Sequence, residues 1–377
     1  MKKRKVLIFY DYFTPAFKAG GPIQSLSNLI NFLSDHYDFF IYTSNKDLDD
    51  TLLEVKHDRW QSHSPTGMIY YSSQKRPSFF SIIDVIRPIR PDIIYINGLY
   101  SLANVIWPLY FVKTSVGFEG IVVIAPRGML SLSALAIKKW KKKTYLTILK
   151  FLIRKSKLNW HATSKEERNS IIEFLPDPGK IVIAQNIPNI KPNVAKVHLE
   201  EMSPLPLRLV TIAVISPMKN IYEVLEALSQ LDFQVSYDIY GPIKDQGYWR
   251  ECQRLIARLP SHIEVNYRHE LEPHKVEETL HKYQIYVQPS QSENFGHSIF
   301  EALQAGLPVI TSYRTPWVLL EESQSGRNIE PNKEGISKGL CELRQEIEQR
   351  KEFRSKEYVK KYLLSKDYLK MYRELFN

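Results

Sequence analysis

The sequence predicts an α/β protein with two domains, each built on a parallel sheet with helices on both faces. Its 377 residues suffice for two domains of about 100–200 residues each. Apolar runs alternate with helical patterns in both halves of the chain, which is typical of strand–helix–strand units. Most of these runs are continuous and do not alternate with polar residues, as expected for parallel strands buried on both faces.

The first half contains a series of apolar runs that we expect to form strands: Val6–Tyr10, Phe39–Thr43, Ile69–Tyr71, Ile93–Ile96, Ile121–Ala125, Trp160–Thr163 and Ile181–Ala184. Helical stripes lie between them. One stripe follows Gly20-Gly21-Pro22, which favours a helix start because proline is tolerated in the first turn. Residues 93–112 carry no charge, but their polar residues favour a strand, a turn and a helix over a membrane span.

A proline-rich stretch without periodicity, residues 188–206, predicts a linker between domains 1–187 and 207–355. After it the alternation resumes. The expected strands are Leu209–Val214, Val235–Tyr240, Ile263–Tyr267, Ile285–Gln288 and Val309–Ser312, and the expected helices lie near Ile221–Leu231, Tyr248–Leu259, Pro273–Lys282 and His297–Ala305. The tail, residues 356–377, has the pattern of a charged helix.

The composition excludes several classes of protein. With 44% hydrophobic and 24% charged residues, the chain is not disordered, and two cysteines cannot form a disulfide framework or a cysteine-rich metal site. The net charge of +10 comes from one patch: eleven Lys or Arg and no acid lie between Glu119 and Glu166. Such a patch indicates an anionic partner such as lipid, nucleic acid or another polyanion, or a solvated helix face.

Open α/β sheets bind ligands at the carboxyl ends of their strands, so the residues after each strand are candidates for a site. Gly20 and Gly21 at a helix start allow close approach of backbone N–H groups to an anion. Lys219 opens a helix in the second half, where it suits a phosphate. The strongest signal is Glu293-Asn294-Phe295-Gly296-His297 followed by Glu301. A dinucleotide fingerprint and a Walker sequence are both missing.

Glu293 and Glu301, separated by seven residues, resemble the motif of the family 4 glycosyltransferases. These are retaining enzymes with two Rossmann-like domains that face a cleft, the GT-B arrangement, and a C-terminal helix that crosses back to the first domain. The segments 125–130, 160–164 and 239–242 resemble a bacterial branch of the family that builds surface polysaccharides.

The resemblance implies a role for each matching residue. Glu301 would bind the ribose hydroxyls of a nucleotide sugar, and Glu293 a hydroxyl of the transferred sugar. Lys219 would neutralise the pyrophosphate. The remaining donor-binding positions would be Asn294, Phe295, Gly296, His297, Gly241, Gly20 and Gly21. The catalytic set would be Glu293, Lys219 and Asn97, with Arg127 and His161 on the acceptor or phosphate side.

Two positions depart from the family pattern. Val214 stands where an arginine is usual, and Asn97 stands where a histidine is usual. Asn97 can hydrogen-bond a sugar hydroxyl but cannot act as a base. Asp47-Leu48-Asp49 matches a metal-binding D-x-D by chance, and we expect neither a metal nor another cofactor.

The resemblance therefore implies a cytoplasmic glycosyltransferase that uses a UDP- or GDP-sugar and a glycan or lipid-linked oligosaccharide acceptor. The first domain would bind the acceptor and the second the nucleotide sugar. The region Lys138–Lys143 would hold the protein on the anionic inner face of the membrane, with no nucleic-acid partner. Two alternatives stay open: a nucleotide-sugar epimerase or synthase of the same fold, and a non-catalytic polyanion-binding protein.

Overall fold

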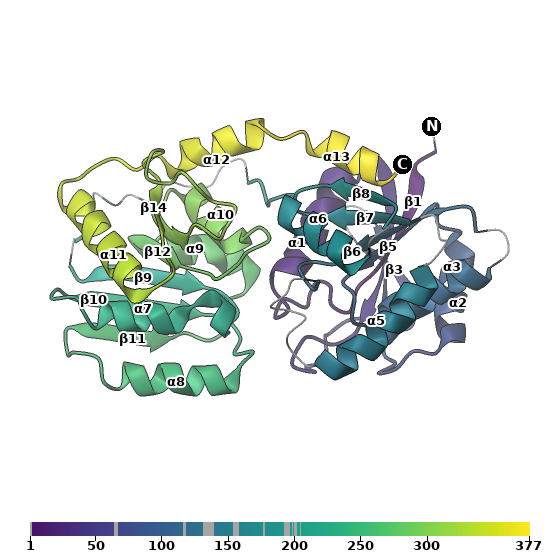
Figure 1. Cartoon of the computed structure of the whole chain (residues 1–377), viewed down its shortest axis with the longest axis horizontal. Coiled ribbons are helices and arrows are strands. Elements are labelled where there is room, and N and C mark those ends of the chain that lie inside the picture. Colours follow the sequence, from purple (N-terminus) through teal and green to yellow (C-terminus); the bar gives the residue numbers. More distant parts are fainter. Residues whose placement is uncertain are drawn as a thin grey trace. The chain divides into compact units, whose positions relative to one another are not determined.

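The computed structural model divides the chain into two units, Met1–Ile187 with Asp367–Asn377 and Pro188–Lys366 (Figure 1). The structure describes residues 2–63, 67–115, 118–130, 139–153, 158–175, 178–191, 197, 199, 202–203 and 205–377, with the side chains of 139–143 left out. Both units are α/β folds built on mainly parallel sheets, which confirms the predicted fold class.

The first unit contains an eight-stranded sheet in the order β3-β4-β2-β1-β5-β6-β7-β8. Its strands are β1 Arg4–Phe9, β2 Tyr37–Ser44, β3 Trp60–His63, β4 Gly67–Ser72, β5 Ile93–Asn97, β6 Ile121–Ala125, β7 Leu158–Ala162 and β8 Lys180–Ile183. All seven predicted strands are present. The sequence analysis missed β3, because this four-residue edge strand is largely polar and pairs antiparallel with β4.

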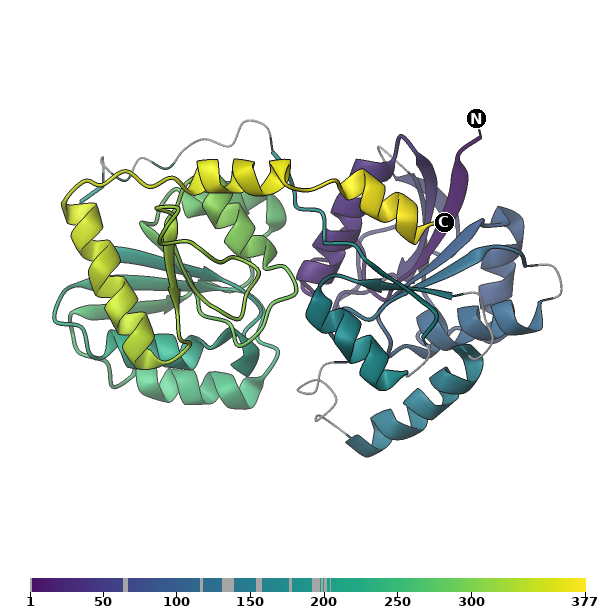
Figure 2. The same ribbon diagram turned by 45° about the horizontal axis from the view of Figure 1, so that its top comes forward.

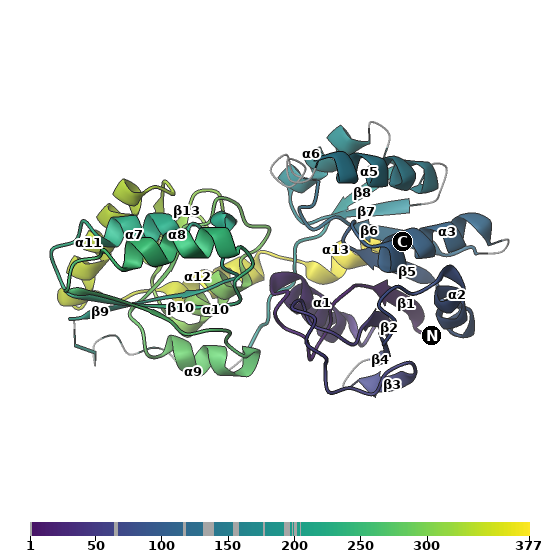
Figure 3. The ribbon, with the colours of Figure 1, turned by 90° about the horizontal axis from the view of Figure 1, so that it is seen from below.

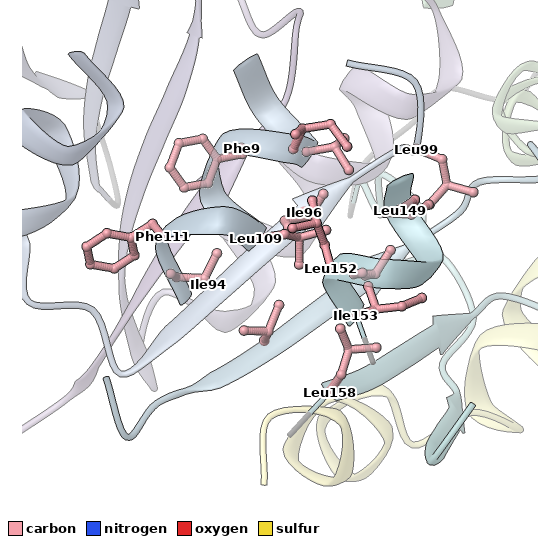
Figure 4. Close-up of a cluster of buried hydrophobic side chains, with 14 of the residues drawn as sticks. Phe9, Ile94, Ile96, Leu99, Leu109, Phe111, Leu149, Leu152, Ile153 and Leu158 are labelled. Carbon is pink, nitrogen blue, oxygen red and sulfur yellow. The ribbon is translucent and has the colours of Figure 1, made fainter. Parts of the chain in front are cut away.

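Helices cover both faces of the first sheet. They are α1 Gly21–Leu33, α2 Phe79–Ile89, the π-helical turn η1 Leu102–Ile106, α3 Trp107–Thr114, α5 Lys139–Ile153, α6 Lys165–Phe174 and α13 Tyr368–Leu375. One face forms a core with α2, α3, α5 and α6, and the cluster of buried side chains there includes Ile94 and Ile96 of β5 together with Leu149 and Leu152 of α5 (Figure 4). On the other face α13 lies beside α1, with Phe32 and Tyr368 in contact (Figure 2).

The second unit contains a six-stranded parallel sheet in the order β11-β10-β9-β12-β13-β14. Its strands are β9 Leu207–Ile212, β10 Val235–Tyr240, β11 Ile263–Tyr267, β12 Ile285–Gln288, β13 Val309–Ser312 and β14 Gly326–Ile329. The sequence analysis missed β14, which contains Arg327 and Asn328. Arg327 is tolerated in this buried strand because its guanidinium pairs with Glu342 at 2.7 Å and Glu346 at 3.2 Å.

The helices of the second unit form two layers. They are the short turns η3 Pro217–Lys219 and η4 Pro273–Lys275, with α7 Ile221–Leu228, α8 Gln246–Ile256, α9 Val276–Leu280, α10 His297–Ala305, α11 Lys333–Glu348 and α12 Ser355–Leu364. Helices α7, α8 and α11 pack on one face of the sheet, and α9, α10 and α12 on the other (Figure 3).

The tail differs from the single helix that the sequence predicts. It forms two helices, α12 and α13, separated at Ser365–Asp367, and the division between the units falls in this break. The Asp367 carboxylate caps the new helix by accepting the N–H of Lys370 at 2.9 Å. Helix α13 then packs on β7 and β8 of the first unit, so the end of the chain crosses back as predicted. In the described parts of the chain, no helix combines the length and the apolarity that a membrane crossing requires.

Candidate functional site

The order of the second sheet points to a site at its carboxyl edge. The chain runs outward from β9 to β11 and then returns to β12 on the other side of β9, so the topology reverses between β9 and β12. Ligands of open α/β sheets bind at such a reversal. Lys219 follows β9 and Glu293 follows β12, and their two loops are joined by a hydrogen bond from the Gln291 N–H to the Met218 carbonyl at 2.9 Å.

Lys219 and Glu293 form an ion pair at this point. The same carboxylate oxygen, Oε1, also accepts hydrogen bonds from Gln288 Nε2 and Ser290 Oγ, each at 2.8 Å. Only 20% of the Lys219 side chain and 10% of the Glu293 side chain is exposed. The structure therefore brings together two of the three predicted catalytic residues, and their charges neutralise each other.

The loop from Asn294 to His297 is shaped by aromatic packing. Phe295 is buried with its ring 5.2 Å from that of Trp317, and the Trp317 indole N–H donates to the Phe295 carbonyl. Gly296 has φ 77°, and a Cβ there would lie 3.0 Å from Ile299 Cδ1. The backbone at the start of α10, and not the Phe295 side chain, is therefore what this loop offers to an anion. Glu301 lies one turn into α10 and is half-buried.

Gly241 supports the Lys219 loop from the neighbouring strand. Its φ is +137°, and an added Cβ would lie 1.9 Å from the Ala213 carbonyl oxygen, so the position requires glycine. The close approach places β10 directly against the segment that contains Val214, which is half-buried. Gly241 thus shapes the path of the chain toward Lys219.

The first unit has its own reversal, between β1 and β5. The loop after β1 leads to Gly20, which has φ 71° at the start of α1, and to the exposed Gly21. Asp47 holds this loop, because its carboxylate accepts the N–H groups of Phe17 and Lys18 at 2.9 and 3.2 Å. The D-x-D sequence is therefore a loop anchor, and among the described residues there is no group of three potential metal ligands.

Arg127 follows β6 and reaches across the same edge of the sheet. Its Nε donates to Asn97 Oδ1 at 2.7 Å, its Nη2 to the Tyr95 hydroxyl at 2.8 Å, and its Nη1 to Asn186 Oδ1. The structure thus joins the predicted residues Asn97 and Arg127 directly. Tyr95 and Asn186 were not predicted, since neither lies in a motif that the sequence analysis used.

His161 lies beneath this cluster and has no exposed surface. Its Nε2 donates to the Ala184 carbonyl at 2.7 Å, so its Nδ1 accepts from the Tyr95 hydroxyl at 2.7 Å. Burial, with the nearby positive charge of Arg127, lowers the pKa of His161 to about 3. The imidazole is therefore neutral at physiological pH, and it fixes Tyr95 and, through Tyr95, Arg127.

Two acidic residues near this edge were not among the predicted site residues. Asp11, just after β1, accepts hydrogen bonds from Ser101 Oγ at 2.8 Å and from Asn104 Nδ2 on one carboxylate oxygen, and burial raises its pKa. Glu167 accepts the Gly128 N–H at 2.6 Å and thereby holds the turn that follows Arg127. The position of Asp11 directly after a strand was the one sequence signal for it.

The predicted basic region is only partly described. Lys138 lies outside the described residues. Lys139 and Lys141–Lys143 fall in the first part of α5, where the backbone alone is described.

Comparison with known proteins relates the second unit to a family of enzymes. Residues 204–360 match the family model described as glycosyl transferases group 1. No curated protein matches the chain in sequence.

Solved structures share the fold over nearly the whole chain. Sucrose-phosphate synthase from Thermosynechococcus elongatus is 13% identical with a TM-score of 0.68, covering 99% of both chains. Anabaena HepE in complex with UDP and glucose is 16% identical with a TM-score of 0.71, covering 99% of this chain and 98% of that one. S. aureus TarM, in complex with Fondaparinux, alpha-GlcNAc-glycerol and UDP, is 12% identical with a TM-score of 0.68 and covers 99% of this chain and 100% of its own. The family model thus matches most of the second unit, and the solved structures show the GT-B class of fold for the whole chain.

Proposed function

We propose that the protein is a glycosyltransferase of group 1, a retaining family 4 enzyme that moves a sugar from a nucleotide sugar to a glycan or lipid-linked oligosaccharide in surface-polysaccharide biosynthesis. The observation that carries the proposal is the Lys219–Glu293 pair, which lies where the second sheet reverses. A cation and a carboxylate at this place suit the two halves of a nucleotide sugar, the pyrophosphate and the sugar hydroxyls.

Donor binding would exchange the partners of the ion pair. Lys219 would turn from Glu293 to the pyrophosphate, helped by backbone N–H groups at Gly296 and His297. Glu293, still held by Gln288 and Ser290, would then accept a hydroxyl of the transferred sugar. Glu301 would bind the ribose hydroxyls. During transfer the sugar–phosphate bond breaks, the acceptor oxygen bonds to the same face of the sugar, and the departing β-phosphate takes the acceptor's proton.

The donor is identified by measuring thermal stabilisation with UDP, GDP and their sugars. HepE and TarM are both described in complex with UDP, which favours a UDP-sugar here. A ligand at one hundred times its Kd stabilises a protein by about 2.7 kcal/mol, which such a screen detects. Glu301→Gln should abolish most of the stabilisation, because an amide accepts weaker hydrogen bonds than a carboxylate. Glu322→Gln on the exposed surface of the same unit is the control.

A synthase of the same fold is the second candidate, favoured by the likeness to sucrose-phosphate synthase, and an epimerase of the same fold is the remaining alternative. The proposed transferase and a synthase differ in the acceptor, and an epimerase uses no acceptor. Product analysis after incubation with the identified donor separates them: a new sugar–sugar bond on a soluble sugar phosphate indicates a synthase, and an isomerised free nucleotide sugar indicates an epimerase. Transfer that requires a lipid-linked acceptor supports the proposal.

A basic and apolar face of the first unit supports docking on an anionic membrane from the cytoplasmic side. Helix α3 contacts both α2 and α5. These three helices expose large apolar side chains: Phe80 at 75%, Tyr110 at 41%, Ile148 at 49% and Phe151 at 65%. The Lys113 ammonium lies 3.7 Å from the centre of the Phe151 ring. Lysines and aromatic residues together suit the headgroup region of a bilayer.

Vesicle binding tests this docking face. Replacing Lys138, Lys139, Lys141, Lys142 and Lys143 by Gln should release the protein from vesicles that contain anionic lipid, since each basic residue contributes about 1 kcal/mol near such a surface. Transfer to a soluble acceptor analogue should stay unchanged. The control replaces five exposed lysines of the second unit, Lys244, Lys275, Lys282, Lys338 and Lys360. Equal binding by both variants at low salt would refute the membrane partner, and tight binding of nucleic acid without transfer would favour the polyanion-binding alternative.

A further inference from the structure

Arg127 is held in place by groups that carry no charge. Its three side-chain hydrogen bonds go to two amide oxygens, of Asn97 and Asn186, and to the hydroxyl of Tyr95. Its backbone is in the left-handed region, with φ 56°, which a residue other than glycine adopts at a cost and which recurs at functional sites. The arginine is thus positioned by several independent contacts, none of which neutralises it.

The guanidinium retains unused capacity for an anion. Arginine has five N–H donors, and three are used, which leaves two. Among the described residues Arg127 forms no ion pair with a carboxylate. The Glu167 carboxylate, which accepts the N–H of Gly128, lies near enough to favour the charged guanidinium and helps to raise the pKa of Arg127, but it forms no ion pair with it. A partly buried charge without a direct counter-ion is costly, so this guanidinium is suited to an anionic ligand.

Asn97 provides a second, independent sign of a missing ligand. Arginine can only donate, so the oxygen of the Asn97 amide must face Arg127 and the nitrogen must face away from it. That nitrogen, Nδ2, is buried without any hydrogen-bond partner, while the residue is only 3% exposed. Buried donors without an acceptor are rare and cost free energy.

We propose that Arg127 and Asn97 form a subsite for an oxyanion, a phosphate or a carboxylate, on the acceptor. The inference rests on the proposed transferase function and adds the chemical class of its acceptor. In that function Lys219 of the second unit serves the donor pyrophosphate, which leaves Arg127 of the first unit for an anionic group of the acceptor. Tyr95 and the buried His161 are positioning residues that hold the guanidinium.

Calorimetric titration of the full chain with inorganic phosphate and with acetate tests the subsite. All variants carry Lys219→Ala, which removes the other expected phosphate ligand. Arg127→Gln should weaken anion binding by about tenfold or more, since hydrogen bonds to charged groups are the strong ones. Asn97→Asp should do the same and leave the fold intact, because its new carboxylate still accepts from Arg127 Nε and neutralises the guanidinium. If Arg127→Gln does not fold, the nearly isosteric Asn97→Asp decides.

Binding of neither anion, or unchanged affinity in Asn97→Asp, would overturn the subsite. A further titration uses the protein with Lys219 intact and saturated with UDP. Phosphate should still bind to the UDP-saturated protein. Loss of phosphate binding in the presence of UDP would overturn the assignment of the subsite to the acceptor. The titrations require no turnover, so the proposed function fails by a different measurement, the absence of UDP binding or of sugar transfer.

Discussion

The two units carry charged residues at corresponding places, but they treat the charges differently. Where the second sheet reverses, Lys219 and Glu293 pair with each other. Where the first sheet reverses, Asp11 and Arg127 are each held by neutral partners, Ser101 and Asn104 for the acid and Asn97, Asn186 and Tyr95 for the base. At a paired site, a charged ligand must replace one member of the ion pair. At an unpaired site, the ligand binds directly to hydrogen-bond donors or acceptors that the protein leaves unused. The two units are thus suited to ligands of different kinds.

Removal of the cation should break the paired site most severely. Lys219→Ala leaves the Glu293 carboxylate, with 10% of its side chain exposed, without its counter-ion and leaves the departing phosphate without its cation. We expect transfer to fall by about 10²–10³, the usual loss for one preorganised stabilising group. Steady-state kinetics with the identified donor measures this, with the exposed Lys244→Ala as control. A rate within a few-fold of the unaltered enzyme would show that the pyrophosphate is held elsewhere.

The unpaired acid should matter for the acceptor and not for the donor. In Asp11→Asn the oxygen that faces Ser101 and Asn104 is kept, but the second carboxylate oxygen becomes an N–H donor. If that oxygen accepts a hydroxyl of the acceptor, KM for the acceptor should rise about 10–100-fold, as for a lost charged hydrogen bond. The donor KM should stay constant, and the exposed Asp35→Asn should change neither. An equal rise in both KM values would contradict the division of labour between the units.

The buried histidine of the first unit should make its stability depend on pH. Burial lowers the pKa of His161 from 6.5 to about 3, so between these values the unfolded chain binds a proton that the folded chain does not. Stability must therefore fall as pH falls through this window, by about 2 kcal/mol between pH 7 and pH 5. Urea denaturation at the two pH values should show that His161→Gln loses this dependence while the exposed His36→Gln keeps it. Identical pH dependence in all three proteins would mean that His161 is accessible to protons in the fold.

Local patterns were sufficient for most of the elements. The predicted bounds of β10–β13 agree with the observed ones. Strands β12 and β13 are buried throughout, as expected for parallel strands covered on both faces, whereas the apolar residues of β10 and β11 alternate with polar ones. The apolar patterns of the sequence were therefore sufficient for these four strands. The apolar patterns did not predict β14, because this strand contains the charged Arg327. Burial of Arg327 is possible because its guanidinium pairs with Glu342 and Glu346 on α11, which comes later in the sequence. The patterns also failed for the tail, where apolar and charged residues continue through the break at Ser365–Asp367 and only packing on two different units separates α12 from α13.

For the candidate site, the sequence by itself determined which residue types follow which strands: Lys219 after β9, Glu293 after β12, Asn97 and Arg127 after neighbouring strands. Spacing along the chain carries that information because parallel strands end at one edge. Only the tertiary structure decided the pairing of charges. Glu293 meets Lys219 across 74 residues, Arg127 meets Asn186 across 59, and His161 meets Tyr95 across 66. Hydrogen bonds between such distant residues depend on strand order, which no local pattern encodes. The unused hydrogen-bonding positions of the Asp11 carboxylate and the Arg127 guanidinium could therefore be identified only in the folded structure.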